Sequence, residues 1–176
     1  MKLRGMVLWI TGLPCSGKTS IAEALHSRLK KENLHSHVLD GDVIRRGLSA
    51  DLGFTEKDRR ENIRRVGEVS KLFAEAGLIV LVAFISPFRT DRDQVRNILK
   101  PDQFVEMYLE CPIEICEERD VKGMYEKARA GEIKHFTGVS SPYEPPINPE
   151  IRLQTHKLSI KECIDFICEY LIRVNR

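Results

Sequence analysis

The sequence predicts an α/β domain in which a parallel five-stranded sheet is flanked by helices on both faces. Three observations support this fold class. Short apolar runs alternate with segments of helical periodicity, and they follow the order βαβαβαβαβα. Strands joined by such crossovers pair in parallel. The 176 residues, 42% hydrophobic and 31% charged, suit one domain spanning 1–176 around a single core.

Five short apolar runs are expected to form the strands. Most are rich in β-branched or aromatic residues, which favour extended backbone. The last run is the weakest of the five. The expected strands are Met6–Thr11, His37–Leu39, Leu78–Ile85, Phe104–Leu109 and Ile151–Leu153.

Five segments between and after these runs are expected to be helices. Thr55 with Asp58, and Ser159 with Glu162, have the spacing of a capping box, which marks a helix N-terminus. Gly77 lies where a helix C-cap is expected. The expected helices are Lys18–Lys31, Thr55–Ala76, Asp91–Leu99, Ile113–Arg119 and Ile160–Val174.

One segment, Val121–Pro149, does not fit the alternation. It is basic at first, in KGMYEKARAGEIKHF, and then rich in proline, in SSPYEPPINP. Proline opposes both helix and central strand. A long irregular segment in an α/β domain is usually a lid or a binding loop, so we expect a lid over about 121–149.

The composition favours a cytoplasmic protein without nucleic-acid or membrane partners. The net charge of +2 arises from mixed signs with no basic tract, and no apolar stretch approaches the length of a membrane span. The N-terminal apolar run has no small-residue cleavage site. An odd number of cysteines without a CxxC pair argues for reduced, mostly buried thiols. These are Cys15, Cys111, Cys116, Cys163 and Cys168.

The segment Gly12–Thr19 matches the phosphate-binding loop pattern G-x-x-x-x-G-K-[ST] at every position, between an expected strand and an expected helix. In this pattern backbone N–H groups surround the β-phosphate of ATP, Lys18 bridges the β and γ oxygens, and Thr19 holds Mg²⁺. A glycine-rich turn with a surface lysine is the other reading. Because the chain has no N-K-x-D guanine-reading sequence and no long second lobe, a small-molecule kinase with a P-loop kinase fold is favoured.

Two carboxylates, Asp40 and Asp42, follow the second expected strand. Ligands of parallel sheets bind at this edge. Asp40 is a candidate for binding a metal-coordinated water, and Asp42 for accepting a proton from an attacking hydroxyl. Either aspartate could instead form a turn and a helix N-cap.

The next helix brings Arg59 and Asn62 to one face, since they are three residues apart. Arginine suits a bidentate grip on phosphate or sulfate, and asparagine can read the edge of a base. A solvated surface position is equally compatible with a single arginine here.

These pieces together resemble the adenylylsulfate kinase family, whose members transfer the ATP γ-phosphoryl group to the ribose 3′-hydroxyl of adenylyl sulfate in sulfate assimilation. The resemblance runs from about Met6 to Leu153. It depends on GLPCSGKTS, LDGDVIRRGL, GFTEKDRRENIRRVGEVSKLFAEAGLIV, AFISPFRTDRD, CEERDVKGMYEKARAGEIKHFTG and SPYEPPINPE. It implies the P-loop kinase fold, ATP and Mg²⁺ as cofactors, and a homodimer.

The resemblance also implies a role for each matching residue. Phe54 and Phe136 would stack on the two faces of the acceptor adenine, although both could be core residues. Lys18, Asp42 and Ser86 would be catalytic, and Thr19 with Asp40 would bind the metal. The ATP contacts would be Gly12, Leu13, Pro14, Cys15, Ser16, Gly17, Lys18, Thr19, Arg119 and Leu158. The adenylyl sulfate contacts would be Asp42, Arg45, Phe54, Arg59, Asn62, Ile85, Ser86, Lys122, His135 and Phe136.

The chain departs from the family pattern at several positions. Pro14 and Cys15 replace smaller residues in the loop, Phe88 replaces a tyrosine, Glu126 a lysine and His135 a glycine. None of these changes removes a phosphate-binding group.

Cys15 places a thiol beside the nucleotide. The helix N-terminus and Lys18 are expected to lower its pKa. Sensitivity of the enzyme to oxidation is the resulting hypothesis.

Three roles are possible for Ser86. In two of them it takes part in the reaction, and in the third it only forms a turn. It could carry the phosphoryl group as a phosphoserine intermediate, but such a nucleophile needs activation, and the motif contains no histidine. We favour direct transfer, with Ser86 presenting its hydroxyl and backbone N–H to the phosphoryl group or sugar. A turn-forming Ser-Pro without ligand contact is the alternative.

Two other functions are compatible with parts of the sequence. A kinase for another small acceptor, a nucleotide or a sugar acid, would share the loop but would not explain the paired phenylalanines with Arg59 and Asn62. A silent nucleotide-binding regulatory module would be expected to lack a phosphate-binding or acidic residue. Lys18 and Asp42 are both present, which favours activity.

Overall fold

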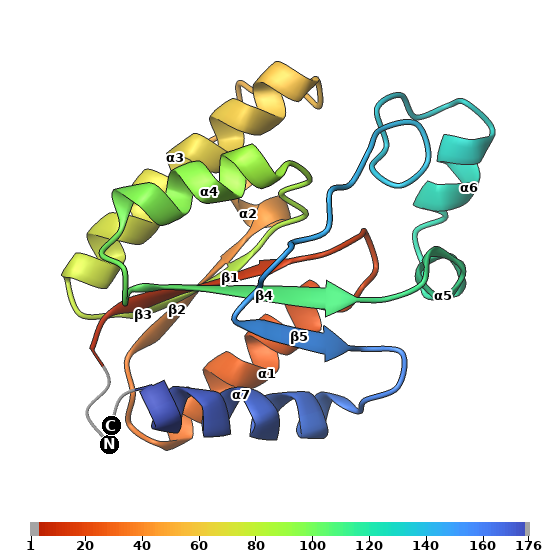
Figure 1. Ribbon diagram of the computed structural model, residues 1–176. Coiled ribbons are helices and arrows are strands. Elements are labelled where there is room, and N and C mark those ends of the chain that lie inside the picture. Colours follow the sequence, from red (N-terminus) through yellow and green to blue (C-terminus); the bar gives the residue numbers. More distant parts are fainter. Residues whose placement is uncertain (1–3, 175–176) are drawn as a thin grey trace.

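The protein is built on one parallel sheet, as the sequence predicts. The computed structural model describes residues 4–174, so both ends of the expected 1–176 domain lie outside the described residues. The spatial strand order is β2-β3-β1-β4-β5, and every neighbouring pair is parallel (Figure 1). The strands are β1 (Met6–Thr11), β2 (Ser36–Asp40), β3 (Ile79–Ala83), β4 (Phe104–Glu110) and β5 (Ile151–Gln154).

Helices cover both faces of the sheet (Figure 1). On one face α1 and α7 pack against side chains such as Leu8 and Met107, and on the other face α3 and α4 pack against Trp9 and Val82. The described helices are α1 (Lys18–Lys31), α2 (Gly41–Arg46), α3 (Glu56–Glu75), α4 (Arg89–Ile98), α5 (Ile113–Glu118), α6 (Met124–Arg129) and α7 (Ile160–Val174).

The helix boundaries follow the sequence signals. The Asp58 backbone N–H donates to the Thr55 hydroxyl at 3.2 Å, and the Ser159 N–H donates to the Glu162 carboxylate at 2.8 Å. Past the end of α3, Gly77 has a φ of 91°, a left-handed conformation that favours glycine. These local contacts fix where α3 and α7 begin and where α3 ends.

The end of the third strand and the segment after the second strand differ from the sequence-based expectation. The third strand ends at Ala83, before the expected Ile85, because the chain turns through a left-handed residue at Ser86. The segment after β2 forms the short helix α2, where the sequence allowed a turn with a helix N-cap.

The expected irregular segment of 121–149 begins with a helix, α6. The Asp120 carboxylate accepts hydrogen bonds from the backbone N–H groups of Lys122 at 3.2 Å and Tyr125 at 2.6 Å. These bonds stabilise the turn that starts the helix. The expectation of irregular backbone holds only for the later, proline-rich part, where no helix or strand is assigned before β5.

The carboxyl ends of the strands meet at the edge of the sheet that faces α5 and α6 (Figure 1). Strand β1 lies between β3 and β4. The loops that leave β1 and β3 lead to helices on opposite faces, α1 and α4. A crevice between such loops is the usual ligand site of an open parallel sheet.

Candidate functional site

The phosphate loop lies between β1 and α1, where the sequence places it. A Cβ atom on Gly12 would lie 2.8 Å from the Leu109 carbonyl oxygen, so only glycine fits at this close approach. Gly17 has a φ of 97° at the start of α1. The Lys18 ammonium donates to the carbonyl oxygens of Gly12 at 3.0 Å and Leu13 at 2.6 Å. The lysine is therefore folded over the loop that it would use to bind phosphate.

Burial lowers the pKa of Lys18 to about 8, against the opposing influence of Cys116, Cys15, Asp40 and Asp42. A buried ammonium without a full counter-charge is destabilised relative to the neutral amine. An anionic phosphate in the loop would supply that counter-charge. The electrostatics of this site therefore favour a bound polyanion.

Thr19 and Asp40 come together at the carboxyl edge of β2. The Thr19 hydroxyl donates to the Asp40 carboxylate at 2.7 Å, and the other carboxylate oxygen accepts the Asp42 backbone N–H at 2.9 Å. Asp40 is thus the N-cap of α2 and also the partner of Thr19. The N-cap interpretation of Asp40 is correct. Both of its carboxylate oxygens already accept a hydrogen bond, and its role at a metal stays a prediction.

The Thr19–Asp40 pair fits Mg²⁺. This cation usually binds to one or two protein oxygens and fills its other positions with phosphate oxygens and waters. Within residues 4–174 no group of three or more histidine, cysteine or acidic side chains is arranged to hold a metal. A Mg²⁺ ion here would therefore need the nucleotide phosphates as ligands.

Asp42 and Lys122 form an ion pair from opposite sides of the candidate acceptor site. The Asp42 side chain is 69% exposed, and one of its carboxylate oxygens lies 3.3 Å from the Lys122 ammonium. This contact joins α2 to the segment that precedes α6. Because the pair is exposed, it is weak and can be exchanged for a ligand.

Arg59 connects two loops that are distant in sequence. Its guanidinium donates to the Phe54 carbonyl oxygen at 3.0 Å and to the His135 carbonyl oxygen at 2.7 Å. The Phe54 ring is 57% exposed, with the Arg45 guanidinium 4.3 Å from its centroid. Phe54 is therefore available for stacking, and the loop before Phe136 lies beside it.

Phe136 has a different environment from Phe54. It is only 9% exposed and packs edge to face against Tyr125, with ring centroids 4.9 Å apart. It belongs to a small apolar cluster with Cys116 and Ala128. In this arrangement it has the core packing that the sequence left open, and its stacking on a base stays a prediction.

Asn62 is buried on α3, one turn after Arg59. Its side-chain oxygen has no hydrogen-bond partner among residues 4–174. A buried carbonyl oxygen without a donor is unfavourable, so a ligand that brings an N–H group would satisfy it. The exocyclic amine of an adenine is such a group.

Ser86 is buried, with 2% of its surface exposed, and its φ is 40°. The Trp9 indole N–H donates to its hydroxyl at 3.0 Å, and the hydroxyl donates to the Phe84 carbonyl oxygen at 3.3 Å. The preceding Ile85 carbonyl oxygen accepts from the Thr11 hydroxyl at 2.7 Å. Both hydrogen bonds of the Ser86 side chain are thus made inside the protein, and its catalytic role stays a prediction.

A cavity of about 640 Å³ opens beside the start of α1. Its walls include Lys18, Arg119 and Leu158. Arg119 donates to the Thr155 carbonyl oxygen at 2.8 Å, and the Thr155 hydroxyl donates to the Ser16 carbonyl oxygen at 2.9 Å. Arg119 and Leu158, the two expected ATP contacts outside the phosphate loop, therefore line one cavity with that loop, in a position suited to a nucleotide base.

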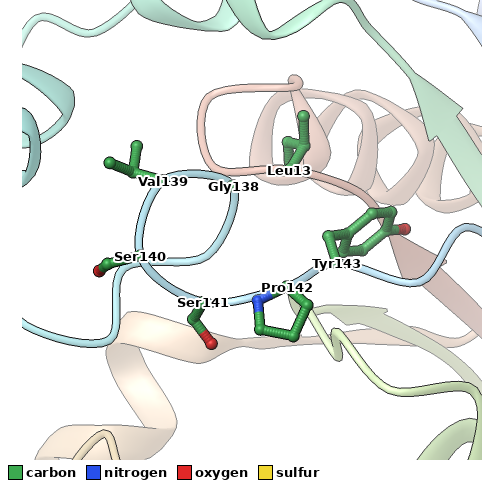
Figure 2. Close-up of a pocket in the computed structure, with 7 residues that line it drawn as sticks. All are labelled: Leu13, Gly138, Val139, Ser140, Ser141, Pro142 and Tyr143. Carbon is green, nitrogen blue, oxygen red and sulfur yellow. The ribbon is translucent and has the colours of Figure 1, made fainter.

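A second cavity, of about 530 Å³, lies on another side of the phosphate loop. Figure 2 shows Leu13 of this loop on one side and the loop 138–143 on the other. The Tyr143 hydroxyl lies 3.0 Å from the Thr11 hydroxyl at the end of β1. The sequence did not indicate that Tyr143 lies at the site, because SSPY has no distinctive feature beyond its proline.

The expected low pKa of Cys15 is wrong. Burial, followed by the Asp120 carboxylate, raises the pKa of this thiol, and the lowering effect of Lys18 is smaller. The Cys15 sulfur lies 3.9 Å from an Asp120 carboxylate oxygen. The chain fold brings this carboxylate to the loop from 105 residues away, and the local sequence gave no sign of it.

Residues 4–154 match the family model described as adenylylsulphate kinase. The chain belongs to this family. It is 56% identical over 170 residues to a probable adenylyl-sulfate kinase of Halalkalibacterium halodurans, covering 97% of this chain and 84% of the relative. It is 57% identical over 165 residues to an adenylyl-sulfate kinase of Marinobacter nauticus, covering 94% and 83%.

The solved structures agree with this assignment to the adenylylsulphate kinase family. The Mycobacterium tuberculosis APS kinase, solved in complex with AMPPNP and APS, is 44% identical and has a TM-score of 0.91, with coverage of 96% of this chain and 98% of that chain. A gluconokinase of Sinorhizobium meliloti is 19% identical, with a TM-score of 0.65 and coverage of 99% and 95%. At that identity it shares the fold alone.

For this adenylylsulphate kinase family member, the structure brings most predicted site residues to the carboxyl edge of the sheet. The Thr19–Asp40 and Asp42–Lys122 contacts and the Phe54–Arg59–His135 connection support the grouping. Ser86 and Phe136 are buried. Among residues 4–174, no helix is long and apolar enough to cross a membrane.

Proposed function

We propose that this protein phosphorylates the ribose 3′-hydroxyl of adenylyl sulfate with ATP, giving 3′-phosphoadenylyl sulfate and ADP. The observation that carries the proposal is the link made by Arg59, which holds the exposed Phe54 beside the His135 loop. A phosphate-binding loop alone would suit many kinases. An aromatic and cationic acceptor site beside it suits an adenine nucleotide with an anionic tail.

In the proposed reaction the phosphate loop holds the ATP phosphates, and the cavity at Arg119 and Leu158 receives the ATP base. The Lys18 ammonium leaves the carbonyl oxygens of its own loop and bridges the β and γ oxygens. Mg²⁺, held by Thr19 and by Asp40 directly or through a water, would neutralise developing phosphate charge when bound. Arg45, Arg59 and Lys122 surround the phosphosulfate of the acceptor.

The transfer itself is direct. The 3′-hydroxyl oxygen forms a bond to the γ-phosphorus while the bond from that phosphorus to the β–γ bridging oxygen breaks, and ADP leaves with that electron pair. The hydroxyl proton passes to the Asp42 carboxylate, which the acceptor frees from Lys122. The inward hydrogen bonds of Ser86 support this single step, because they leave its hydroxyl without a neighbouring base.

We also propose that residues of about 121–149 act as a lid over the acceptor. Two contacts join this segment to the expected acceptor residues, at Asp42–Lys122 and at Arg59–His135. Both involve exposed or backbone groups that can separate without unfolding the sheet.

A homodimer, a cytoplasmic location and one domain over 1–176 complete the proposal. The family resemblance supports the homodimer, and the composition supports the location. Sedimentation of the purified protein and fractionation of cells would test the first two.

The activity is tested by incubating the protein with ATP, Mg²⁺ and adenylyl sulfate, then separating the products by chromatography. We expect ADP and a 3′-phosphorylated product in equal amounts. AMP and gluconate serve as alternative acceptors in parallel reactions. Faster ADP release with either of them would favour another small-molecule kinase, and ATP binding without turnover on any acceptor would favour a silent regulatory module.

A further inference from the structure

Arg92, on α4, is a buried cation with three separate partners. Its side chain is 2% exposed. The guanidinium donates to the Glu106 carboxylate at 2.7 Å, to the Ser86 carbonyl oxygen at 2.6 Å and to the Glu144 carbonyl oxygen at 2.8 Å. Burying a cation is unfavourable unless such partners replace water. One side chain thus joins β4, the turn after β3, and the proline-rich segment.

The first of these segments is the turn at Ser86. Its left-handed φ of 40° is strained for a residue with a side chain and persists only where surrounding contacts hold it. Trp9 and Thr11 of β1 supply two of these contacts, at 3.0 Å and 2.7 Å. Arg92 supplies the third, and it is the one that approaches from α4.

The second segment is the strap, defined here as residues 142–150, which is the last part of the lid segment and leads into β5. The Glu144 backbone N–H donates to the Pro87 carbonyl oxygen at 2.8 Å, and the Arg89 N–H donates to the Glu144 carboxylate at 2.8 Å. Arg92 of α4 donates to the Glu144 carbonyl oxygen and adds a further hydrogen bond to the same residue. These hydrogen bonds hold the Ser86 turn against the strap.

The charges around Arg92 are balanced. Glu106 faces it from β4, and a second Glu106 oxygen lies 3.6 Å from Arg96, one turn further along α4. Arg96 binds both carboxylate oxygens of Glu150, at 2.6 Å and 2.8 Å. Arg96 anchors the far end of the strap but has no described hydrogen bond to the Ser86 turn, which makes it a matched control.

We propose that Arg92 is a positioning residue for phosphoryl transfer, because its guanidinium fixes the Ser86 turn relative to the strap. The strap continues the loop 138–143, which faces Leu13 of the phosphate loop (Figure 2). The proposal depends on the proposed function only for the identity of the acceptor. Lysine cannot replace this group, since its single ammonium lacks the planar fork that reaches three acceptors.

The test compares Arg92→Lys with Arg96→Lys in the full chain, with ATP and adenylyl sulfate. We expect Arg92→Lys to lower kcat about ten- to a hundredfold, because small misplacements of reacting groups have effects of this size. The KM for ATP should change less than about twofold, since the phosphate loop is untouched. Arg96→Lys should lower kcat by at most about twofold. Amide exchange in 84–88 and at Tyr143 and Glu144 should accelerate together in Arg92→Lys only.

Equal kcat values for Arg92→Lys and the parent would overturn the proposal. A fall in kcat that is fully explained by a smaller fraction of folded protein would overturn it too. If Arg92→Lys does not fold, Glu106→Gln replaces it, since it keeps the two carbonyl contacts and weakens the third. A several-fold fall in kcat with unchanged KM for ATP then supports the proposal, and an unchanged kcat rejects it. A parent inactive on adenylyl sulfate refutes the proposed function instead, and the amide-exchange comparison still decides whether Arg92 holds the Ser86 turn and the strap together.

Discussion

The two sides of the candidate site are held together in different ways. On the ATP side, the phosphate loop, β1 and α1 form a continuous unit whose groups bind backbone atoms within a few residues, as Lys18 does with Gly12 and Leu13. On the acceptor side, residues from distant segments meet through side chains, as Arg59 does with Phe54 and His135. The backbone of the phosphate loop is therefore fixed by local contacts, and the Lys18 side chain has to move to bind phosphate. The acceptor side depends on a few contacts that a ligand can rearrange.

The largest effect is expected on the ATP side, from Lys18→Met. We expect turnover to fall by at least about 10²–10³-fold, because the cation that stabilises the transferring charge is lost. ADP release at saturating adenylyl sulfate measures this effect. Lys30→Met is the matched control, because Lys30 is an exposed lysine of the same helix. Equal losses in the two variants would mean that Lys18 acts only through helix stability.

A smaller and more selective effect is expected on the acceptor side, from Arg59→Lys. The KM for adenylyl sulfate should rise about tenfold or more, because a hydrogen bond from a charged group contributes about 1.5–3 kcal/mol. The KM for ATP should stay nearly constant. Steady-state kinetics with each substrate varied in turn measures both values.

Arg64→Lys is the control for Arg59→Lys, since Arg64 is an exposed residue of α3 that pairs with Glu61. A rise in the KM for ATP equal to that for adenylyl sulfate in Arg59→Lys would show that the two sides are not independent.

The ATP side should also be the more sensitive to high pH. Burial lowers the pKa of Lys18 to about 8, so the free protein loses this ammonium above about pH 8. Bound phosphate favours the charged form, and ATP affinity should therefore fall about tenfold between pH 7 and pH 9. Calorimetric titration of ATP at several pH values measures the change, and Lys18→Met should show no such dependence.

The lowered pKa of Lys18 also affects stability, but with the opposite dependence on pH. Because the folded-state pKa lies below the ordinary value of 10.5, the unfolded state binds the extra proton between about pH 8 and pH 10.5. The contribution of Lys18 to the free energy of unfolding therefore rises with pH over this window. If Lys18 is the group that titrates, ATP affinity should fall with pH while its contribution to the free energy of unfolding rises. General alkaline unfolding would lower both quantities.

The sequence predicts the ATP side better than the acceptor side for a physical reason. The loop Gly12–Thr19 and the ends of α1 and α3 depend on contacts between residues close in sequence. The burial of Phe136 against Tyr125, the effect of Asp120 on Cys15 and the contacts of Arg92 depend on segments that only the fold brings together. Periodicity and spacing carry no information about such pairs.

The smallest effect is expected where the two sides meet, from Ser86→Ala. Turnover should fall about two- to tenfold, because a neutral hydrogen bond contributes about 0.5–1.5 kcal/mol. The Trp9 indole N–H would lose its acceptor, and the strained turn would lose one of its holding contacts. Trp9→Phe removes the same hydrogen bond from the other side. If Ser86 acts through position, the two variants should lose similar turnover.

A phosphoryl carrier would behave differently from a positioning group. With Ser86 as the carrier, Ser86→Ala would abolish turnover, Trp9→Phe would retain most of it, and radiolabelled ATP would leave phosphoserine on the parent protein. We expect no such label, since the Ser86 hydroxyl is buried and directs its proton to the Phe84 carbonyl oxygen. We therefore predict that Ser86 acts by holding the turn in place and that the reactive oxygen is the 3′-hydroxyl of the substrate.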